Sequence, residues 1–429
     1  MNATDTHRAI DAVWRIESAR LIAGLTRLVG DVGAAEDLAQ DALVVALEKW
    51  PTAGVPDNPG AWLMATAKHR AIDIIRRRSM LDRKHEQLGH ELEARQEAAV
   101  PDLDAALDDH VGDDLLRLMF VACHPVLPME ARVALTLRLL GGLTTGEIAR
   151  AFLVPEATVA QRIVRAKRTL ADAKVPFEVP RGAELDARLG SVLGVIYLIF
   201  NEGYSATAGD DWMRPTLCQE AMRLGRVLAG LAPSEPEVHG LVALMEIQAS
   251  RAAARVTSSG EPVLLLDQDR GRWDQLLIRR GLAALARAEE LGGAQGPYAL
   301  QAAIAACHTR ARSADATDWE RIATLYDALA ARTPSPVVEL NRAVAVGMAR
   351  GPAAGLELAD ALQSEPSLKT YHLLPSVRGD LLAKLGRNDE ARAEFERAAS
   401  LTQNARERTL LLQRAAESLR GRVTAPSAG

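Results

Sequence analysis

Apolar residues recur at intervals of three and four along most of the chain, without the strict alternation typical of a half-buried strand. Ala, Leu, Glu and Arg, which all favour helices, dominate the sequence. Pro- and Gly-rich breaks separate the periodic stretches at 51–60, 175–182, 231–237, 291–297 and 333–336. The pattern predicts an all-α protein with two small helical units followed by a larger helical region.

The sequence lacks the usual signals of several classes of protein. No apolar run reaches the ~18 residues of a membrane span, and the charged N-terminus lacks the apolar segment of a signal peptide. The three cysteines stand far apart, and there is no CxxC, HExxH, Walker A, GxGxxG or GxSxG motif. We therefore expect a cytoplasmic protein that has no membrane, metal or cofactor site and is not an enzyme.

The net charge of −5 hides an uneven distribution. The stretch 62–84 has seven Lys/Arg against two Asp, whereas 85–114 has ten acids against one Arg. The stretch 158–170 has four basic residues and no acid. Two basic helices separated by an acidic segment indicate contact with nucleic acid. The predicted divisions are 1–84, an acidic linker at 85–112, a second unit at 113–175 and a helical region at 185–425.

The segment LTTGEIARAFLVPEATVAQRIVRAKRTL (143–170) predicts a helix-turn-helix. Thr144 or Thr145 can cap the first helix, and Pro155 suits the start of the second. Leu153 stands where such turns commonly have Gly, so we expect an unusual turn.

In the second helix of this segment, one face is apolar and the other basic. The predicted buried stripe is Val159, Ile163, Ala166 and Leu170. The opposite face carries Thr158, Gln161, Arg162, Arg165 and Arg168, and Lys167 adds a further cation. Arg and Gln can hydrogen-bond base edges in the major groove, and the other cations can neutralise phosphates. A basic helix alone can be merely solvated, but its place after a helix and a short turn favours DNA binding.

The N-terminal unit contains two further predicted helices, at 31–51 and 55–78. The first should direct Leu43, Leu47 and Trp50 inward, and the second Leu63, Ala67, Ala71 and Ile74. Another stripe of the first helix is mostly acidic and consists of Asp37, Gln40, Asp41, Val44 and Glu48. This stripe is either solvated or binds a partner helix.

At these motifs the chain resembles the extracytoplasmic-function (ECF) sigma factors of bacterial RNA polymerase. The runs AEDLAQDAL (35–43), GAWLMATAKHRAIDIIRRR (60–78) and TVAQRIVRAKRTL (158–170) stand in that family's order. The resemblance implies a non-catalytic protein that brings core polymerase to promoters and assists melting of the −10 element. The alternatives are a helix-turn-helix regulator with a sensor domain that acts without polymerase, and an interaction scaffold.

The resemblance also implies site roles. The acidic stripe would bind the β′ clamp helices, and the recognition helix would enter the −35 major groove. The predicted unit at 113–175 would contact the β flap. The loop 55–61 would capture a flipped base, and the acidic linker would follow the RNA-exit path. The implied −10 contacts are Asn58, Trp62, Lys68, His69, Arg70, Arg76 and Arg77.

The C-terminal region contains a weak internal repeat, in which 346–362 aligns with 383–399 at an offset of 37. The repeat resembles tetratricopeptide (TPR) units, which present a protein-binding surface, although an irregular helical domain stays an alternative. The segments VLGVIYLIFNEGYSAT (192–207) and LLLDQDRGRWD (264–274) resemble an ECF subgroup with a TPR-like extension. We expect a regulatory loop at Asp267, Asp269, Arg270 and Arg272; the alternatives are an internal salt-bridged turn and, least favoured, a catalytic carboxylate pair.

Overall fold

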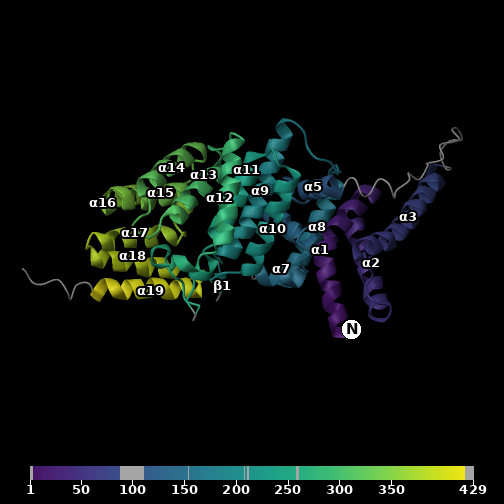
Figure 1. Cartoon of the computed structure of the whole chain (residues 1–429), viewed down its shortest axis with the longest axis horizontal. Coiled ribbons are helices and arrows are strands. Elements are labelled where there is room, and N and C mark those ends of the chain that lie inside the picture. Colours follow the sequence, from purple (N-terminus) through teal and green to yellow (C-terminus); the bar gives the residue numbers. More distant parts are fainter. Residues whose placement is uncertain are drawn as a thin grey trace, which may run out of the picture. The chain divides into compact units, whose positions relative to one another are not determined.

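The computed structural model describes residues 3–86, 111–152, 154–206, 208–209, 212–257 and 260–420. Within these ranges nearly all regular structure is helical, apart from a short parallel pair, β1 (Ala208–Gly209) and β2 (Gln403–Asn404) (Figure 1). The predicted all-α class is confirmed. Most of the predicted acidic linker lies outside the described residues. No helix in the described ranges is long and apolar enough to cross a membrane.

The chain divides into two compact units, Met1–Ile196 and Tyr197–Gly429. The first begins with three mutually packed helices, α1 (Ala3–Val29), α2 (Val32–Ala53) and α3 (Pro59–Glu86). A Cβ atom added at Gly60 would meet Glu17 Oε2 at 2.8 Å, so the start of α3 approaches α1 closely. In α3, Leu63, Ala67 and Ala71 are buried as predicted, and the side chain of Ile74 lies outside the described part.

Helix α2 packs through small residues. Ala35, Ala39, Ala42 and Ala46 are each 0% exposed. Of the three side chains expected to point inward, Trp50 is buried, Leu43 is half-buried and Leu47 is 36% exposed, so the prediction for Leu47 is wrong. Alanines allow the neighbouring helices to approach, and this moves the buried face away from the larger leucine.

The rest of the first unit consists of α5 (Val111–Ala122), α6 (Met129–Leu139), α7 (Thr145–Phe152), α8 (Glu156–Asp172) and the beginning of α9 (Ala183–Tyr204). Two side chains of α9 bond backbone carbonyls near the end of α5. Arg188 Nη2 donates to the Phe120 carbonyl at 2.9 Å, and Ser191 Oγ donates to the Cys123 carbonyl at 2.6 Å. The N-terminal half of α9 is therefore anchored to the first unit.

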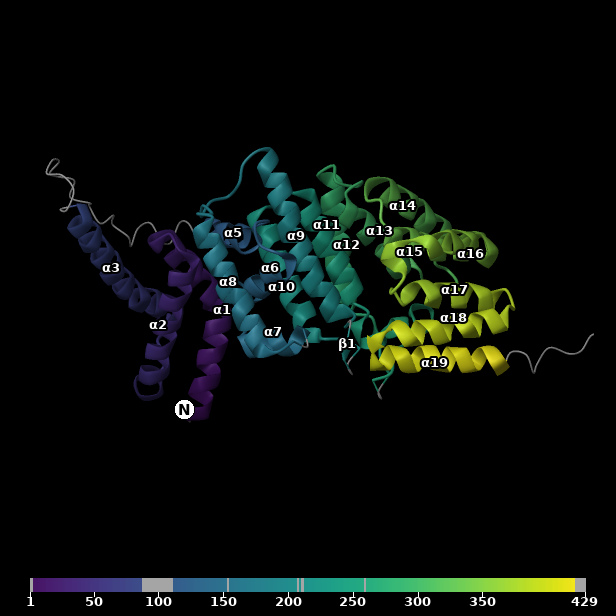
Figure 2. The same cartoon turned by 180° about the vertical axis from the view of Figure 1, so that it is seen from behind.

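In the second unit, successive helices pack on one another (Figure 2). After α9 come α10 (Pro215–Leu231), α11 (Pro236–Ala249), η1 (Ala252–Ala254), η2 (Leu265–Asp267), η3 (Arg270–Arg272), α12 (Gln275–Glu290), α13 (Pro297–Arg310) and α14 (Trp319–Arg332). The series ends with α15 (Pro336–Arg350), α16 (Pro352–Ala361), η4 (Leu362–Ser364), η5 (Pro366–Leu368), α17 (Leu373–Lys384), α18 (Asn388–Leu401) and α19 (Ala405–Arg420).

The repeat noted in the sequence corresponds to two helix pairs. Helix α17 starts 37 residues after α15, and α18 starts 36 residues after α16. Each pair has a close crossing at glycine: a Cβ at Gly355 would meet the Ala343 carbonyl at 2.6 Å, and one at Gly379 would meet the Phe395 ring at 2.8 Å. Assignment of these pairs to the TPR class stays a prediction.

Candidate nucleic-acid interface

Helix α8 has the two faces that its sequence predicts. Val159, Ile163, Ala166 and Leu170 are all at most 5% exposed, which confirms the buried stripe. The opposite face is accessible, with Gln161, Arg165 and Arg168 exposed and Thr158 and Arg162 half-buried. Arg168 lies 3.6 Å from Asp172 one turn later, and both side chains are more than two-thirds exposed. The face thus offers an amide and several guanidinium groups to a ligand.

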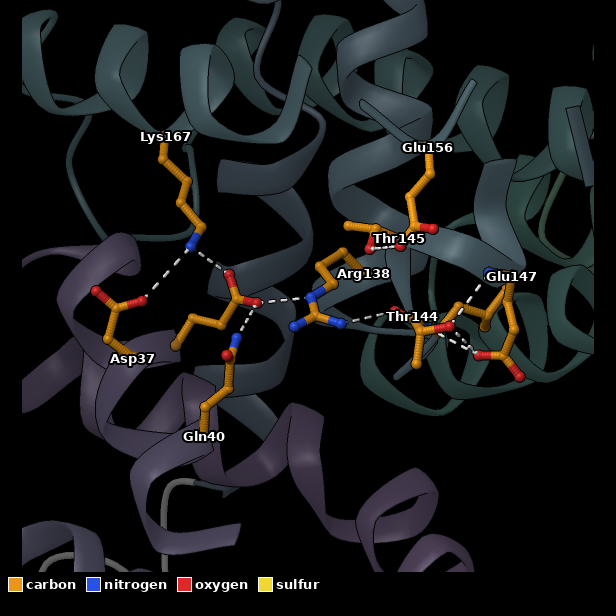
Figure 3. A network of polar contacts seen from close by, with 10 residues as sticks. Asp37, Gln40, Arg138, Thr144, Thr145, Glu147, Glu156 and Lys167 are labelled. Atoms are coloured by element: carbon orange, nitrogen blue, oxygen red, sulfur yellow. Dashed lines mark hydrogen bonds and ion pairs between the residues drawn. The ribbon is translucent and has the colours of Figure 1, made fainter. Parts of the chain in front are cut away.

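The entry to the helix-turn-helix is held by reciprocal hydrogen bonds. Thr144 N donates to Glu147 Oε2 at 2.8 Å, and Glu147 N donates to Thr144 Oγ1 at 3.2 Å. This capping box makes Thr144 the cap of α7. Thr145 Oγ1 donates to Glu156 Oε1 at 2.9 Å, which links the starts of α7 and α8 (Figure 3). Leu153, where an unusual turn is expected, lies outside the described residues.

A buried carboxylate joins α2 to the helix-turn-helix. Glu36 is 2% exposed, and its two oxygens lie 2.7 Å from Arg138 Nε in α6 and 2.5 Å from Lys167 Nζ in α8 (Figure 3). Gln40 Nε2 also donates to Glu36 Oε1 at 2.7 Å. Burial alone would raise the pKa of Glu36, but Lys167 and Arg138 outweigh it and hold the pKa below its usual value.

Sequence reasoning missed Glu36 and Arg138. The local sequence contains no signal for this contact, because Glu36 stands directly beside Asp37, an acid that the structure leaves exposed. The structure also places Lys167, one of the predicted −35 contacts, in this ion pair, with its side chain 19% exposed.

The predicted polymerase-binding stripe lies along α2 with mixed accessibility. Asp37 is 80% exposed and 4.0 Å from Lys167 Nζ, and Gln40 is half-buried. Asp41 forms a 2.7 Å ion pair with Arg70 of α3, so the structure brings together one residue from each of two predicted sites. Val44 is 52% exposed, and Glu48 is also exposed.

The predicted −10 residues are spread along α3, from Asn58 just before its first residue to Arg77. Asn58 Oδ1 accepts from Ala61 N at 3.1 Å and so caps the helix. Trp62 packs edge-on against Trp50, with ring centroids 5.3 Å apart. A cavity of about 710 Å3 between α1 and α3 is lined by Asn58, Lys68 and His69, together with the acids Glu17 and Asp114. The side chains of Arg76 and Arg77 lie outside the described part of the chain.

The predicted regulatory loop falls on η2 and η3 of the second unit. Asp267, Asp269 and Arg272 are exposed, and Asp269 Oδ1 accepts from Gly271 N at 2.9 Å. Arg270 is half-buried and donates to the backbone carbonyls of His308 and Ala311. Arg270 thus ties the loop to the end of α13.

In the described ranges, no three His, Cys, Asp or Glu residues are grouped so that they could hold a metal. Burial raises the pKa of Cys123 to about 11 and that of Cys218 to about 12, so both thiols stay protonated near neutral pH.

Models of two known regions match the first unit in order. "Sigma-70 region 2" matches residues 16–80, and "Sigma-70, region 4" matches residues 117–170. A third model, "Family of unknown function (DUF6596)", matches residues 188–289. A helical bundle followed by this helix-turn-helix defines the class of sigma-70-type transcription proteins.

Individual proteins are similar to this chain over different lengths. The "Uncharacterized protein R00370" of Rhizobium meliloti (strain 1021) is 45% identical over 89% of both chains. The "ECF RNA polymerase sigma factor SigK" of Mycobacterium ulcerans is 32% identical over 34% of this chain and 75% of its own length. The "Probable ECF RNA polymerase sigma factor SigI" of Mycobacterium tuberculosis is 28% identical, and the match covers 58% of that protein. The chain belongs to the ECF group of the sigma-70 family. No solved structure matches it.

Proposed function

We propose that this sigma factor directs core RNA polymerase to selected promoters and assists the opening of the −10 element. The observation that carries the proposal is the pair of sigma regions in one unit, with the basic face of α8 accessible beside an accessible stripe of α2. In this proposal residues 1–84 bind polymerase and the −10 element, and residues 113–175 bind the −35 element.

At −35, α8 enters the major groove. Gln161, Arg162 and Arg165 contact base edges, and Thr158, Lys167 and Arg168 contact phosphates or neighbouring positions. The accessibility of Gln161 and Arg165 supports this assignment. The ion pair of Lys167 with Glu36 means that this lysine is available to DNA only when it leaves the carboxylate.

At −10, the loop 55–61 receives a base that leaves the stack, and α3 follows the strand. The cavity beside Asn58, Lys68 and His69 supports this role, because it offers side-chain donors along the first three turns of α3. Trp62 supplies an aromatic surface, and Arg70, Arg76 and Arg77 supply positive charge.

The α2 stripe binds the clamp helices of the polymerase β′ subunit, and the helix-turn-helix unit contacts the β flap. The exposure of Asp37, Val44 and Glu48 supports the first contact, since a docking face needs accessible charge around an apolar centre.

The second unit, with its TPR-like helix pairs, regulates the sigma regions or binds a protein partner, and the loop at 267–272 takes part. A chain that ends at Ile196 keeps the Arg188 and Ser191 anchors and tests this role. We expect its transcription from the cognate promoter to differ several-fold from that of the full chain, at equal helical content by circular dichroism. Equal transcription under all conditions would show an independent second unit.

The function is tested by reconstitution of the full chain with core polymerase on a library of random promoters. Sequencing of the transcripts should reveal one shared −35/−10 pair that depends on the added chain. A protein that binds duplex DNA but neither binds core nor supports transcription would instead be a polymerase-independent regulator. That alternative is not favoured, because such a regulator needs no region 2.

A further inference from the structure

Three arginines meet in the second unit around the end of α11. Arg251 is 9% exposed and Arg255 is 8% exposed, and both follow α11 directly in the chain. Arg270, from η3, is close enough to Arg251 that the positive charge of Arg251 lowers the pKa of Arg270, in addition to the effect of burial. His308, 7% exposed in α13, faces the same two arginines; burial and their charges lower its pKa to about 4, so it stays neutral at neutral pH.

Positive charge at this place has no counter-charge in the described part of the chain. No carboxylate there forms an ion pair with Arg251, Arg255 or Arg270. Of the acids on the adjacent helices, Glu202 pairs with Arg214, and Glu246 pairs with Arg226 through its Oε1 atom. Buried charges in proteins are normally paired, because an uncompensated one strongly destabilises the fold.

Hydrogen-bond donors without partners also indicate that a negatively charged group is missing here. Among the described atoms, Arg251 Nε, Arg255 Nη1 and Trp212 Nε1 are buried without a hydrogen-bond partner. The Arg255 guanidinium lies 3.6 Å from the ring centroid of Tyr204 and 5.7 Å from that of Trp212, and Arg251 lies 6.0 Å from Tyr204. Aromatic faces partly compensate a cation but accept few hydrogen bonds.

An apolar cavity adjoins these groups. Its volume is about 250 Å3, and its mostly apolar walls include Tyr204, Met213, Cys218, Met222 and Leu277. Asp274 also lines it, and its Oδ1 atom accepts hydrogen bonds from the backbone N–H groups of Leu276 and Leu277 at the start of α12. Tyr204 is the ring on which Arg255 stacks, and the positive charge of Arg255 also acts on the Cys218 thiol. A cavity of this size suits the body of a small molecule, with a few polar groups at one end to orient it.

We propose that this cluster binds a small organic anion. A carboxylate or phosphate group lies between Arg251 and Arg255, where the planar guanidinium groups can hold oxyanions in pairs of hydrogen bonds. The apolar body of the ligand occupies the cavity beside Tyr204 and Cys218. The positive charge of Arg270 also attracts the anion, while its guanidinium group keeps its hydrogen bonds to the carbonyls of His308 and Ala311.

Calorimetric titration of the full chain with benzoate and with phenyl phosphate, at constant ionic strength in chloride, tests the proposal. Saturable binding of either probe is expected, and inorganic phosphate alone should bind more weakly because it leaves the cavity empty. The better of the two organic probes identifies the anionic group. Arg255→Met should weaken binding on the order of tenfold or more, whereas Arg280→Gln, at an exposed arginine of α12, should not change it.

Thermal unfolding separates a ligand site from a structural cluster. Without ligand, Arg255→Met should unfold at or above the temperature of the original chain, because the variant removes an unpaired buried charge. If Arg255→Met has a lower unfolding temperature and unchanged probe binding, Arg255 only stacks on Tyr204 and the proposal is wrong. The proposal is also wrong if none of the three anions shows saturable binding to the original chain. Neither measurement uses polymerase or DNA, so its outcome is independent of the proposed sigma function.

Discussion

Glu36 and Lys167 form an ion pair in which the carboxylate and the ammonium nitrogen are 2.5 Å apart. One residue belongs to α2 and the other to α8, and the carboxylate is almost completely buried. The pair therefore fixes the predicted polymerase-binding helix against the predicted −35 helix.

Glu36→Gln should lower the free energy of unfolding by about 3 kcal/mol near neutral pH, because it leaves Arg138 and Lys167 without their shared counter-charge. The pKa of Glu36 is held below its ordinary value of 4.5. Its ionic contribution is thus complete above pH 4.5 and disappears as the pH falls through the lowered pKa. Urea unfolding followed by circular dichroism over this range should show the difference between variant and original chain shrinking. Asp37→Asn, at an 80% exposed side chain, is the control and should have little effect.

Arg162→Ala and Arg165→Ala should each weaken binding to the −35 element by about 1–3 kcal/mol if these side chains contact bases. Gel-shift or fluorescence titrations against single-base variants of the element provide the measurement. Loss confined to one base position identifies base contacts, and equal loss on all sequences identifies phosphate contacts. Lys49→Ala, at an exposed basic residue of α2, should bind normally. Unchanged binding by both arginine variants would contradict the assigned face.

Asp37→Arg combined with Asp41→Arg should abolish association with core polymerase, since charge reversal turns attraction into repulsion. Co-purification with core measures the effect, and circular dichroism verifies that the helices are intact. Glu130→Arg reverses an exposed charge in α6 and should still co-purify. Because Asp41 also pairs with Arg70, Asp41→Asn shows how much of the loss comes from that contact alone.

The second unit should lose stability as the pH falls from about 6.5 to about 4. The pKa of His308 is lowered from 6.5 to about 4 by burial and by Arg251 and Arg270, so between these values the unfolded chain binds a proton that the folded chain does not. The total loss is roughly 3 kcal/mol. His308→Phe keeps a ring against Trp319, 5.3 Å away, and should flatten this part of the pH profile. An equally steep profile for the variant would mean that other groups titrate there.

Gly281→Ala should destabilise the second unit by about 1–3 kcal/mol, because the added Cβ would lie 2.6 Å from Ile247 Cγ1 and 3.1 Å from the Ala243 carbonyl. Thermal unfolding measures the effect. Gly230→Ala, in α10, has nothing within 4 Å of its new Cβ and should be neutral or slightly stabilising. Similar behaviour of the two variants would show that α11 and α12 yield to the added methyl group.

The spacing of apolar residues predicted those features that are determined within a single helix, such as its buried face. The buried stripe of α8 follows from a spacing of three and four residues, and every member is buried. The same rule failed at Leu47, because it weights large apolar residues and the contact face of α2 consists of alanines. The offset of 37 in the C-terminal region was also visible, and it equals the distance between the starts of α15 and α17.

Contacts between distant segments could not be predicted in this way. Glu36 and Arg138 are 102 residues apart, and nothing local distinguishes Glu36 from its solvated neighbour Asp37. The arginines after α11 were likewise invisible, because the apolar surroundings that bury them come from several helices.

The pairing of Lys167 with Glu36 affects how the number of counterions released on DNA binding should be interpreted. The logarithm of the DNA-binding constant falls linearly with the logarithm of the salt concentration, and each cation that neutralises a phosphate adds about 0.9 to the size of this slope. A lysine already neutralised within the protein adds to this slope only if it exchanges a carboxylate for a phosphate. The salt slope thus reports whether Glu36 keeps its partner in the DNA complex. If the measured slope is smaller by about one unit than the slope expected when every cation of α8 neutralises a phosphate, the pair of Glu36 and Lys167 persists in the complex.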